Sequence, residues 1–372
     1  MVRETIMSLG NLKDFLTNGA VLQTGPDLFK ILIGPFEKCS RLQSLDVRNA
    51  TMLYMPQFWD FMSSGPQFSQ EDVYVGSKCQ SLSREEFIQF LSQLPSQRPE
   101  VIWGAVNESQ FRAQFDWSQE NFSRGQLVKT VPIIRQEGES QFKEENLLWC
   151  LQQLVQEKTF GWVYSFCEAG RGFVGRTPEI LSQWHIRDHR LHTVALAGTY
   201  PSSAAAFSEI QNDPKILHEH RVVIDDILNQ LGEQTFVSDL QCGPTDVLEL
   251  KHLLHLMTEI EMEVADTSAV FEALNALHPT AAMGLYPRRA DLFLQLREFS
   301  VQKARGFFAS PFVFFDHEQV NGVVAIRNLM FNPRSVQIFS GCGVTAASDC
   351  AQELTELQSK RDSVKKMLGL FS

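Results

Sequence analysis

The sequence has little of several features that mark membrane, secreted or nucleic-acid-binding proteins. No apolar run approaches the roughly 20 residues that cross a bilayer, and residues 1–16 lack the apolar core of a signal peptide. The net charge is -11 and no basic block occurs, which disfavours nucleic acid as a partner. We therefore expect a cytoplasmic protein that binds neither membranes nor nucleic acid.

Cysteine patterns and repeats are also lacking. The seven cysteines are scattered and form no CxxC pair, which fits reduced thiols and argues against a zinc site. No segment repeats with a period of 20–50 residues, and there is no low-complexity tract. What remains is an ordinary globular composition, 44% hydrophobic over 372 residues, enough for one large domain or two smaller ones.

A long helical pattern near the C-terminus carries the most informative charges. A short β-type run ends in the turn Ser340–Gly343, and Asp349 is a good N-cap for the helix that follows. Glu353, Glu356 and Lys360 share one face of that helix because of their spacing. Such a stripe could hold a divalent cation and an anion side by side, although a solvated charged face is the commoner explanation.

Two other charged residues lie in apolar segments. Lys129 falls inside the β-like run 127–134, where an edge residue pointing to water is the commoner explanation and a desolvated functional amine is the alternative. Glu219 lies on the apolar face of a predicted helix, which is costly unless a metal or a cation pairs with it. The triplet His218-Glu219-His220 does not indicate zinc, because adjacent helical residues diverge by about 100°.

Two more residues have open interpretations. The apolar stretch 248–264 contains His252 and His255, and a lone histidine in such a run is more often a satisfied core residue than a ligand. Arg327 lies in an apolar strand, so it either faces inward toward an anion or outward toward solvent. A hairpin is predicted from the runs 307–315 and 320–328.

The order of ten short motifs resembles that of the chorismate-utilising enzymes, the family of isochorismate, salicylate, anthranilate and aminodeoxychorismate synthases. The motifs are LVKTVPI, GRTPE, ALAGT, LHEHRVVID, LKHLLHL, LHPTAAMGLYPR, RGFFASP, VAIR, SGCGV and ELTELQSK. The resemblance implies an α+β fold like that of anthranilate synthase component I, with a central β core wrapped by helices. It also implies a single chorismate-binding domain over residues 1–372, with a divergent part (1–110) and a motif-bearing part (111–372).

Two positions separate the reactions within that family. Ammonia-using members have a non-basic residue where Lys129 stands, and aminodeoxychorismate synthases have a lysine where Ala197 lies. A lysine at the first position and none at the second resembles isochorismate synthase, for menaquinone or siderophore synthesis, with no glutaminase subunit as partner. A salicylate synthase and a chorismate-binding protein with impaired turnover are the alternatives.

The resemblance implies a role for each candidate residue. Lys129 would be the base that activates water for addition at C2 of chorismate, with burial and nearby positive charge favouring its neutral form. Glu179 would be the acid that protonates the leaving C4 hydroxyl, its pKa raised by desolvation against Leu196. The implied anchors are Glu219 and Glu356 for Mg²⁺, supported by Glu353, and Gly198, Thr199, His255, Arg327, Gly341, Gly343 and Lys360 for the substrate.

Three departures from the family pattern motivate the impaired-turnover alternative. Ile216 stands where an acidic residue usually precedes the metal glutamate by one turn, and Phe308 replaces a tyrosine. Arg176 would lie beside Glu179 and favour its ionised form, which would weaken it as an acid.

Overall fold

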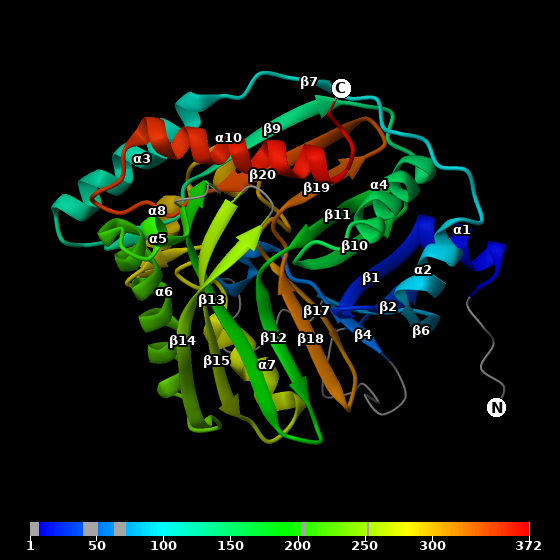
Figure 1. Cartoon of the computed structure of the whole chain (residues 1–372), viewed down its shortest axis with the longest axis horizontal. Coiled ribbons are helices and arrows are strands. Elements are labelled where there is room, and N and C mark those ends of the chain that lie inside the picture. The colour runs from blue at the N-terminus through cyan, green and yellow to red at the C-terminus, as the bar shows by residue number, and fades with distance from the viewer. Residues whose placement is uncertain (1–6, 40–50, 63–71, 202–205, 251–252, 372) are drawn as a thin grey trace.

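Two nine-stranded sheets form the centre of the protein (Figure 1). The computed structural model describes residues 7–39, 51–62, 72–201, 206–250 and 253–371. The first sheet consists, in spatial order, of β6 (Lys78–Ser83), β2 (Leu28–Ile33), β1 (Asn18–Gly25), β10 (Trp162–Glu168), β11 (Arg171–Thr177), β19 (Asn328–Asn332), β20 (Ser335–Gly341), β9 (Ile133–Glu139) and β7 (Ile102–Trp103). The second consists of β14 (Ser238–Leu250), β15 (Leu253–Glu263), β13 (Arg190–Pro201), β12 (Ile180–His185), β18 (Gln319–Val324), β17 (Pro311–Phe315), β4 (Met52–Tyr54), β5 (Val73–Val75) and β3 (Glu37–Cys39). A separate two-stranded sheet pairs β8 (Lys129–Thr130) with β16 (Leu285–Tyr286).

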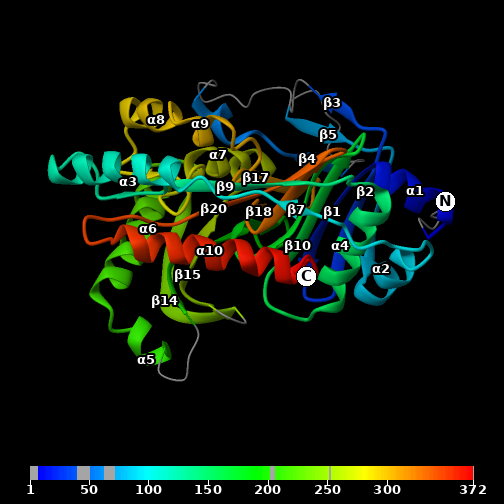
Figure 2. The same ribbon diagram turned by 90° about the horizontal axis from the view of Figure 1, so that it is seen from above.

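Helices cover the outer faces of both sheets (Figures 1 and 2). Those against the first sheet are α1 (Leu9–Thr17), α2 (Arg84–Leu91), α4 (Glu144–Gln156) and α10 (Cys350–Met367). Those against the second are α6 (Pro214–Gly232) and α7 (Thr267–Leu277). The others are η2 (Phe58–Met62), α3 (Glu108–Ser123), α5 (Ala206–Ile210), α8 (Ala290–Arg297) and α9 (Ser300–Lys303). The α+β fold with a β core wrapped by helices is confirmed, and no helix in these described ranges is long and apolar enough to span a membrane.

The strand β17 shows why the two sheets pack together. Phe312 and Phe314 point into the aromatic layer between the sheets, where Phe312 packs 5.5 Å from Tyr164, measured between ring centroids. Val313 and Phe315 point the other way, into the core beneath the helices. Side chains alternate along a strand, so a strand buried on both faces must be continuously apolar.

The chain passes between the two sheets at two adjacent places. β11 leads into β12 through Pro178 and Glu179, and β18 leads into β19 through residues 325–327. Arg327 adopts a positive φ of 57° at its crossing. The N–H of Val324 donates to the carbonyl of Glu179 at 3.1 Å, so the two crossings lie side by side.

Several predictions from the sequence can be compared with the observed strands. The run 127–134 divides into β8 and β9, because Pro132 has no N–H to continue a ladder. The stretch 248–264 falls in two strands, β14 and β15, and His252 lies outside the described residues. The predicted hairpin is confirmed as β17 and β18. Strands β1 and β2 pair beside β10, so part of the divergent segment shares a sheet with the motif-bearing part.

Candidate active site

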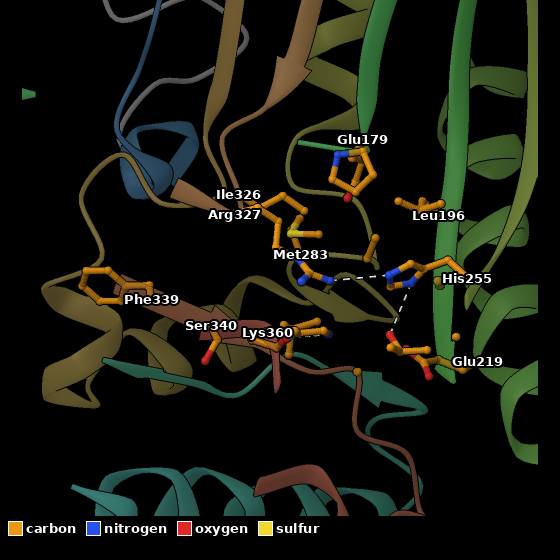
Figure 3. Close-up of a pocket in the computed structure, with 18 of the residues that line it drawn as sticks. Glu179, Leu196, Glu219, His255, Met283, Ile326, Arg327, Phe339, Ser340 and Lys360 are labelled. Carbon is orange, nitrogen blue, oxygen red and sulfur yellow. Dashed lines mark hydrogen bonds between the residues drawn. The ribbon is translucent and has the colours of Figure 1, made fainter. Parts of the chain in front are cut away.

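A cavity is lined by residues of the two crossings, β13, β15, α6 and α10 (Figure 3). It contains about 690 Å³ of empty space, part of it open to solvent. Among the residues that line it are the predicted site residues Lys129, Glu179, Leu196, Gly198, Thr199, Glu219, His255, Arg327, Gly341, Gly343 and Lys360. The structure therefore brings together residues from eight separate segments, and the remaining two candidates, Glu353 and Glu356, lie on α10 next to Lys360.

Lys129 is deeply buried, so the edge-residue explanation is wrong. Its side chain is 1% exposed, and the ammonium donates to the carbonyl of Ala281 at 2.6 Å. The charged atom beside it is Oε1 of Glu219, 3.6 Å away. We expected positive charge near this amine, whereas the structure places the Glu219 carboxylate beside it.

Glu179 lies on the wall of the same cavity, at the crossing from β11 to β12. Burial raises the pKa of this carboxyl to about 8, against the opposing effects of the charges on Lys129 and Lys360. Its Oε2 atom is buried without a hydrogen-bond partner among the residues that the structure describes. The carboxyl is therefore suited to remain protonated at neutral pH and to give up that proton to a group in the cavity.

The Arg176 guanidinium does not point at the Glu179 carboxyl, contrary to the expectation from sequence that it would favour the ionised form of Glu179. Its guanidinium points to the last turn of α4 and the chain that follows, where it donates to the carbonyls of Leu154, Glu157 and Thr159. The cations that lower the pKa of Glu179 are those of Lys129 and Lys360. Arg176 therefore braces a loop and does not weaken Glu179 as a candidate acid.

The charged stripe of α10 is not a solvated face. Glu353 is 2% exposed and pairs with Lys215 at 2.7 Å, while Glu356 pairs with Lys360 at 2.5 Å. Burial, together with the charges of Glu356 and Glu353, raises the pKa of Glu219. Lys215 was not among our candidates, although its position four residues before Glu219 places both on one face of α6.

The donor chemistry of these three glutamates fits Mg²⁺. Hard carboxylate oxygens are the ligands that this ion prefers, and their mutual repulsion is relieved by a cation. Gly343 makes room, since a Cβ there would lie 1.8 Å from Oε1 of Glu219. The described side chains form no ready-made cluster of three metal ligands, and Glu356 would have to exchange Lys360 for the ion.

His255 connects two of the predicted substrate contacts (Figure 3). Its Nδ1 lies 3.3 Å from the hydroxyl of Thr199, and its Nε2 lies 3.5 Å from Nη2 of Arg327. Burial and the charge of Arg327 lower the pKa of the imidazole. The ring is therefore neutral, with Nε2 facing the guanidinium as an acceptor and Nδ1–H directed at Thr199.

Two cations face the cavity from different elements. Burial lowers the pKa of Arg327 to about 10, which leaves it charged at neutral pH. Lys360 donates to the carbonyl of Gly341 at 2.9 Å, which holds its ammonium at the end of β20. A guanidinium and an ammonium beside the same cavity are suited to bind carboxylates.

Sequence reasoning missed one charged residue of the cavity wall. Arg305 is 0% exposed, and its guanidinium lies 3.3 Å from the ring centroid of Phe58. It is the first residue of the motif RGFFASP, so its position in the motif was an available signal. Phe308 lacks the expected hydroxyl and stacks on Phe339, with 5.4 Å between ring centroids.

Comparison with known proteins supports this assignment. The model of the family described as "Chorismate binding enzyme" matches residues 71–369. The salicylate biosynthesis isochorismate synthase of Pseudomonas aeruginosa is 32% identical over 213 residues, which make up 55% of this chain and 43% of that protein. The isochorismate synthase MenF of Bacillus subtilis is 25% identical over 323 residues, 82% of this chain and 60% of that protein. The chain thus spans about half the length of these relatives.

Solved structures have the same fold. The putative 2,3-dihydroxybenzoate-specific isochorismate synthase DhbC of Bacillus anthracis superposes with a TM-score of 0.77 at 20% identity, covering 97% of this chain and 99% of that one. The menaquinone-specific isochorismate synthase MenF of Escherichia coli gives 0.77 at 18% identity, covering 99% and 92%. Since the family model matches most of the sequence, this chain belongs to the chorismate-binding enzyme family.

Proposed function

We propose that this chain is an isochorismate synthase, which isomerises chorismate by adding water at C2 and releasing the C4 hydroxyl. The observation that carries this proposal is that one cavity holds a buried amine and a buried carboxyl whose pKa is raised. Lys129 is 1% exposed, and the pKa of Glu179 is raised to about 8. The names of the relatives described above support the same reaction class.

The two groups divide the proton transfers between them. The neutral form of Lys129 takes a proton from the attacking water, and the carboxyl of Glu179 gives its proton to the leaving hydroxyl. One water is consumed and one is released, so the reaction is an isomerisation. Lys129 ends protonated and Glu179 ionised, and a proton must return from the first to the second before the next turnover.

The remaining residues hold the substrate. Arg327 and Lys360, with the backbone near Gly341 and Gly343, bind the enolpyruvyl carboxylate of chorismate. Glu219 and Glu356 would hold Mg²⁺, with Glu353 in support, and the ion would supply positive charge for the ring carboxylate. Thr199 and His255 contact the ring side of the substrate, and Leu196 and Gly198 line it.

The direct test is to incubate the protein with chorismate and Mg²⁺ and to identify the products. We expect isochorismate alone. Salicylate with pyruvate would identify a salicylate synthase instead, and binding without turnover would identify an impaired chorismate-binding protein. The same assay with excess EDTA should abolish turnover if Mg²⁺ anchors the substrate.

A Lys129→Ala variant tests the proposed base. We expect kcat to fall at least about 100-fold, the usual contribution of a general base, while the affinity for chorismate changes less. Lys30→Ala is the matched control, because Lys30 is a buried lysine paired with Asp316 at 2.5 Å and lies outside the cavity lining. Undiminished turnover of Lys129→Ala would contradict the assignment.

A further inference from the structure

A second cavity lies against the first one. It contains about 680 Å³ of empty space and shares two wall residues, Pro178 and Arg327, with the candidate active site. Its wall also includes Thr159, Phe160, Ser363 and Lys366. The two cavities are therefore neighbours, and they adjoin at the crossings that carry Glu179 and Arg327.

The two cavities follow one face of α10. Lys360 lines the first, while Ser363, Lys366 and Met367 line the second. Residues spaced by three and four along a helix lie one above the other, so these side chains form a continuous edge. This face of α10 therefore has Lys360 at the first cavity and Lys366 at the second.

Both cavities are partly open to solvent, but they differ in how far their lining residues are exposed. Functional groups of the first are nearly enclosed, with Glu179 3% and Lys129 1% exposed. The second reaches the surface, because Phe160 is 42% exposed and both Thr159 and Lys366 are exposed. A ligand bound at the enclosed groups needs a path, and the second cavity adjoins them.

The charge of the second cavity opposes that of the protein. The chain carries a net charge of -11, which repels a dianion at long range. The cavity, however, is lined by three cations, Arg176, Arg327 and Lys366, and by one carboxylate, that of Glu157. The Nε atom of Arg176 is buried there without a hydrogen-bond partner among the described residues.

We propose that this second cavity is the entrance of the active site, a cationic vestibule in which a dicarboxylate substrate is collected before it passes Arg327. The inference rests on the proposed function for the identity of that substrate. Lys366 attracts the dianion at the surface, and Arg327 is the contact common to the vestibule and the reaction chamber.

A pair of serine variants on α10 tests the route. Ser363→Phe fills the vestibule, whereas Ser359→Phe places the same side chain on the exposed face of the same helix. Binding of chorismate is measured by surface plasmon resonance in a Glu179→Gln background, so that turnover does not interfere. We expect Ser363→Phe to lower both kon and koff at least about tenfold with little change in Kd, since an obstructed path slows entry and exit alike. Ser359→Phe should leave both rates unchanged.

A charge reversal tests the attraction. We expect Lys366→Glu to lower kcat/KM for chorismate about tenfold at an ionic strength of about 0.01 M, and the loss should shrink to about twofold near 1 M, because salt screens exposed charges. Lys303→Glu is the control, since it makes the same change of net charge at an exposed site on α9 that does not line this cavity.

The outcomes separate the inference from the function on which it rests. A wild-type protein that neither binds nor converts chorismate overturns the proposed function and this inference with it. Wild-type turnover combined with equal binding rates in the two serine variants overturns the entrance alone. A change in Kd without a change in kon for Ser363→Phe also overturns it, because the residue would then belong to the bound state.

Discussion

Burial of Glu179 connects activity with pH. Its pKa of about 8 means that the proposed acid loses its proton as the pH rises through that value. We therefore expect kcat/KM, which reports the free enzyme, to fall on the alkaline side with an apparent pKa near 8. Glu179→Gln should lower kcat at least about 100-fold at every pH, as removal of a general acid does. The measurement is a pH–rate profile of both proteins, and a wild-type profile that is flat up to pH 9 would contradict the assignment.

Glu179 should also make the protein less stable as the pH rises. An ordinary carboxyl titrates near 4.5, while the folded protein holds this proton up to about pH 8. The native state thus binds more protons than the unfolded state between these values, and the free energy of unfolding falls as the pH rises across that window. Glu179→Gln should lack this contribution and gain stability relative to wild type between pH 5 and pH 8. Urea unfolding at both pH values measures it, with the exposed Glu137→Gln as control.

The sequence indicated which individual residues are unusual, but not which groups surround them in the structure. Lys129 and Glu219 stand out in the sequence because each interrupts an apolar segment, and both prove to be buried. Their 3.6 Å contact could not be predicted, because it joins β8 to α6 across 90 positions of sequence. Arg176 shows the opposite error, since closeness to Glu179 in sequence did not place the two charges together.

At the scale of the element, a bulge in β13 positions the substrate-facing backbone. The register of β13 against β15 shifts between Ala197 and Thr199, and Gly198 adopts a φ of 76° there. A Cβ at this position would lie 2.6 Å from Cγ2 of Ile216 on α6. Position 198 thus requires glycine for two reasons: the backbone has a positive φ, and α6 leaves no room for a Cβ.

Gly198→Ala should therefore destabilise the protein by about 2 kcal/mol or more, because strain of the backbone and a clash add together. Ile216→Ala in the same chain should recover part of the clash but not the backbone strain, which a double-mutant cycle of urea unfolding resolves. Gly125→Ala is the control, because its φ is 66° and no atom lies within 4 Å of the added Cβ. Equal losses for the two glycines would show that the approach of Ile216 is unimportant.

Helices were predicted better than strand partners. Asp349 caps α10 as predicted, because an N-cap acts on its own next turn, and Asp213 caps α6 in the same way. Strand pairing is instead set by distant chain segments, which is why nothing local predicted β1 beside β10.

At the scale of the whole molecule, the divergent N-terminal segment is part of the core. β1 and β2 lie inside the first sheet between β6 and β10, and Lys30 of β2 pairs with Asp316 next to β17 of the second sheet. We expect a fragment of residues 111–372 to fail to fold cooperatively, because the edge of β10 and the aromatic layer would be exposed. Circular dichroism with thermal unfolding measures this, and a sharp transition in the fragment would contradict it.

The overall fold could be predicted from the resemblance, which depends on the order of ten motifs, but the sheet order could not. The family model begins at residue 71, so the first strands lie outside it, and their place in the sheets comes from the structure alone. The net charge of the sequence also constrained where a negatively charged substrate could bind. A chain of net charge -11 that binds a dianion must concentrate cations locally, and Arg327 and Lys360 do so.

The two adjacent crossings make catalysis sensitive to the alignment of the layers. Glu179 and Arg327 sit where the backbone passes from one sheet to the other, with Val324 joined to Glu179 by a backbone hydrogen bond. Sliding of one layer over the other would change the spacing between acid and guanidinium before any strand separated. High pressure or a cavity in the aromatic layer should thus lower turnover while the secondary structure is intact. A loss of turnover would then report a change in how the two sheets are aligned.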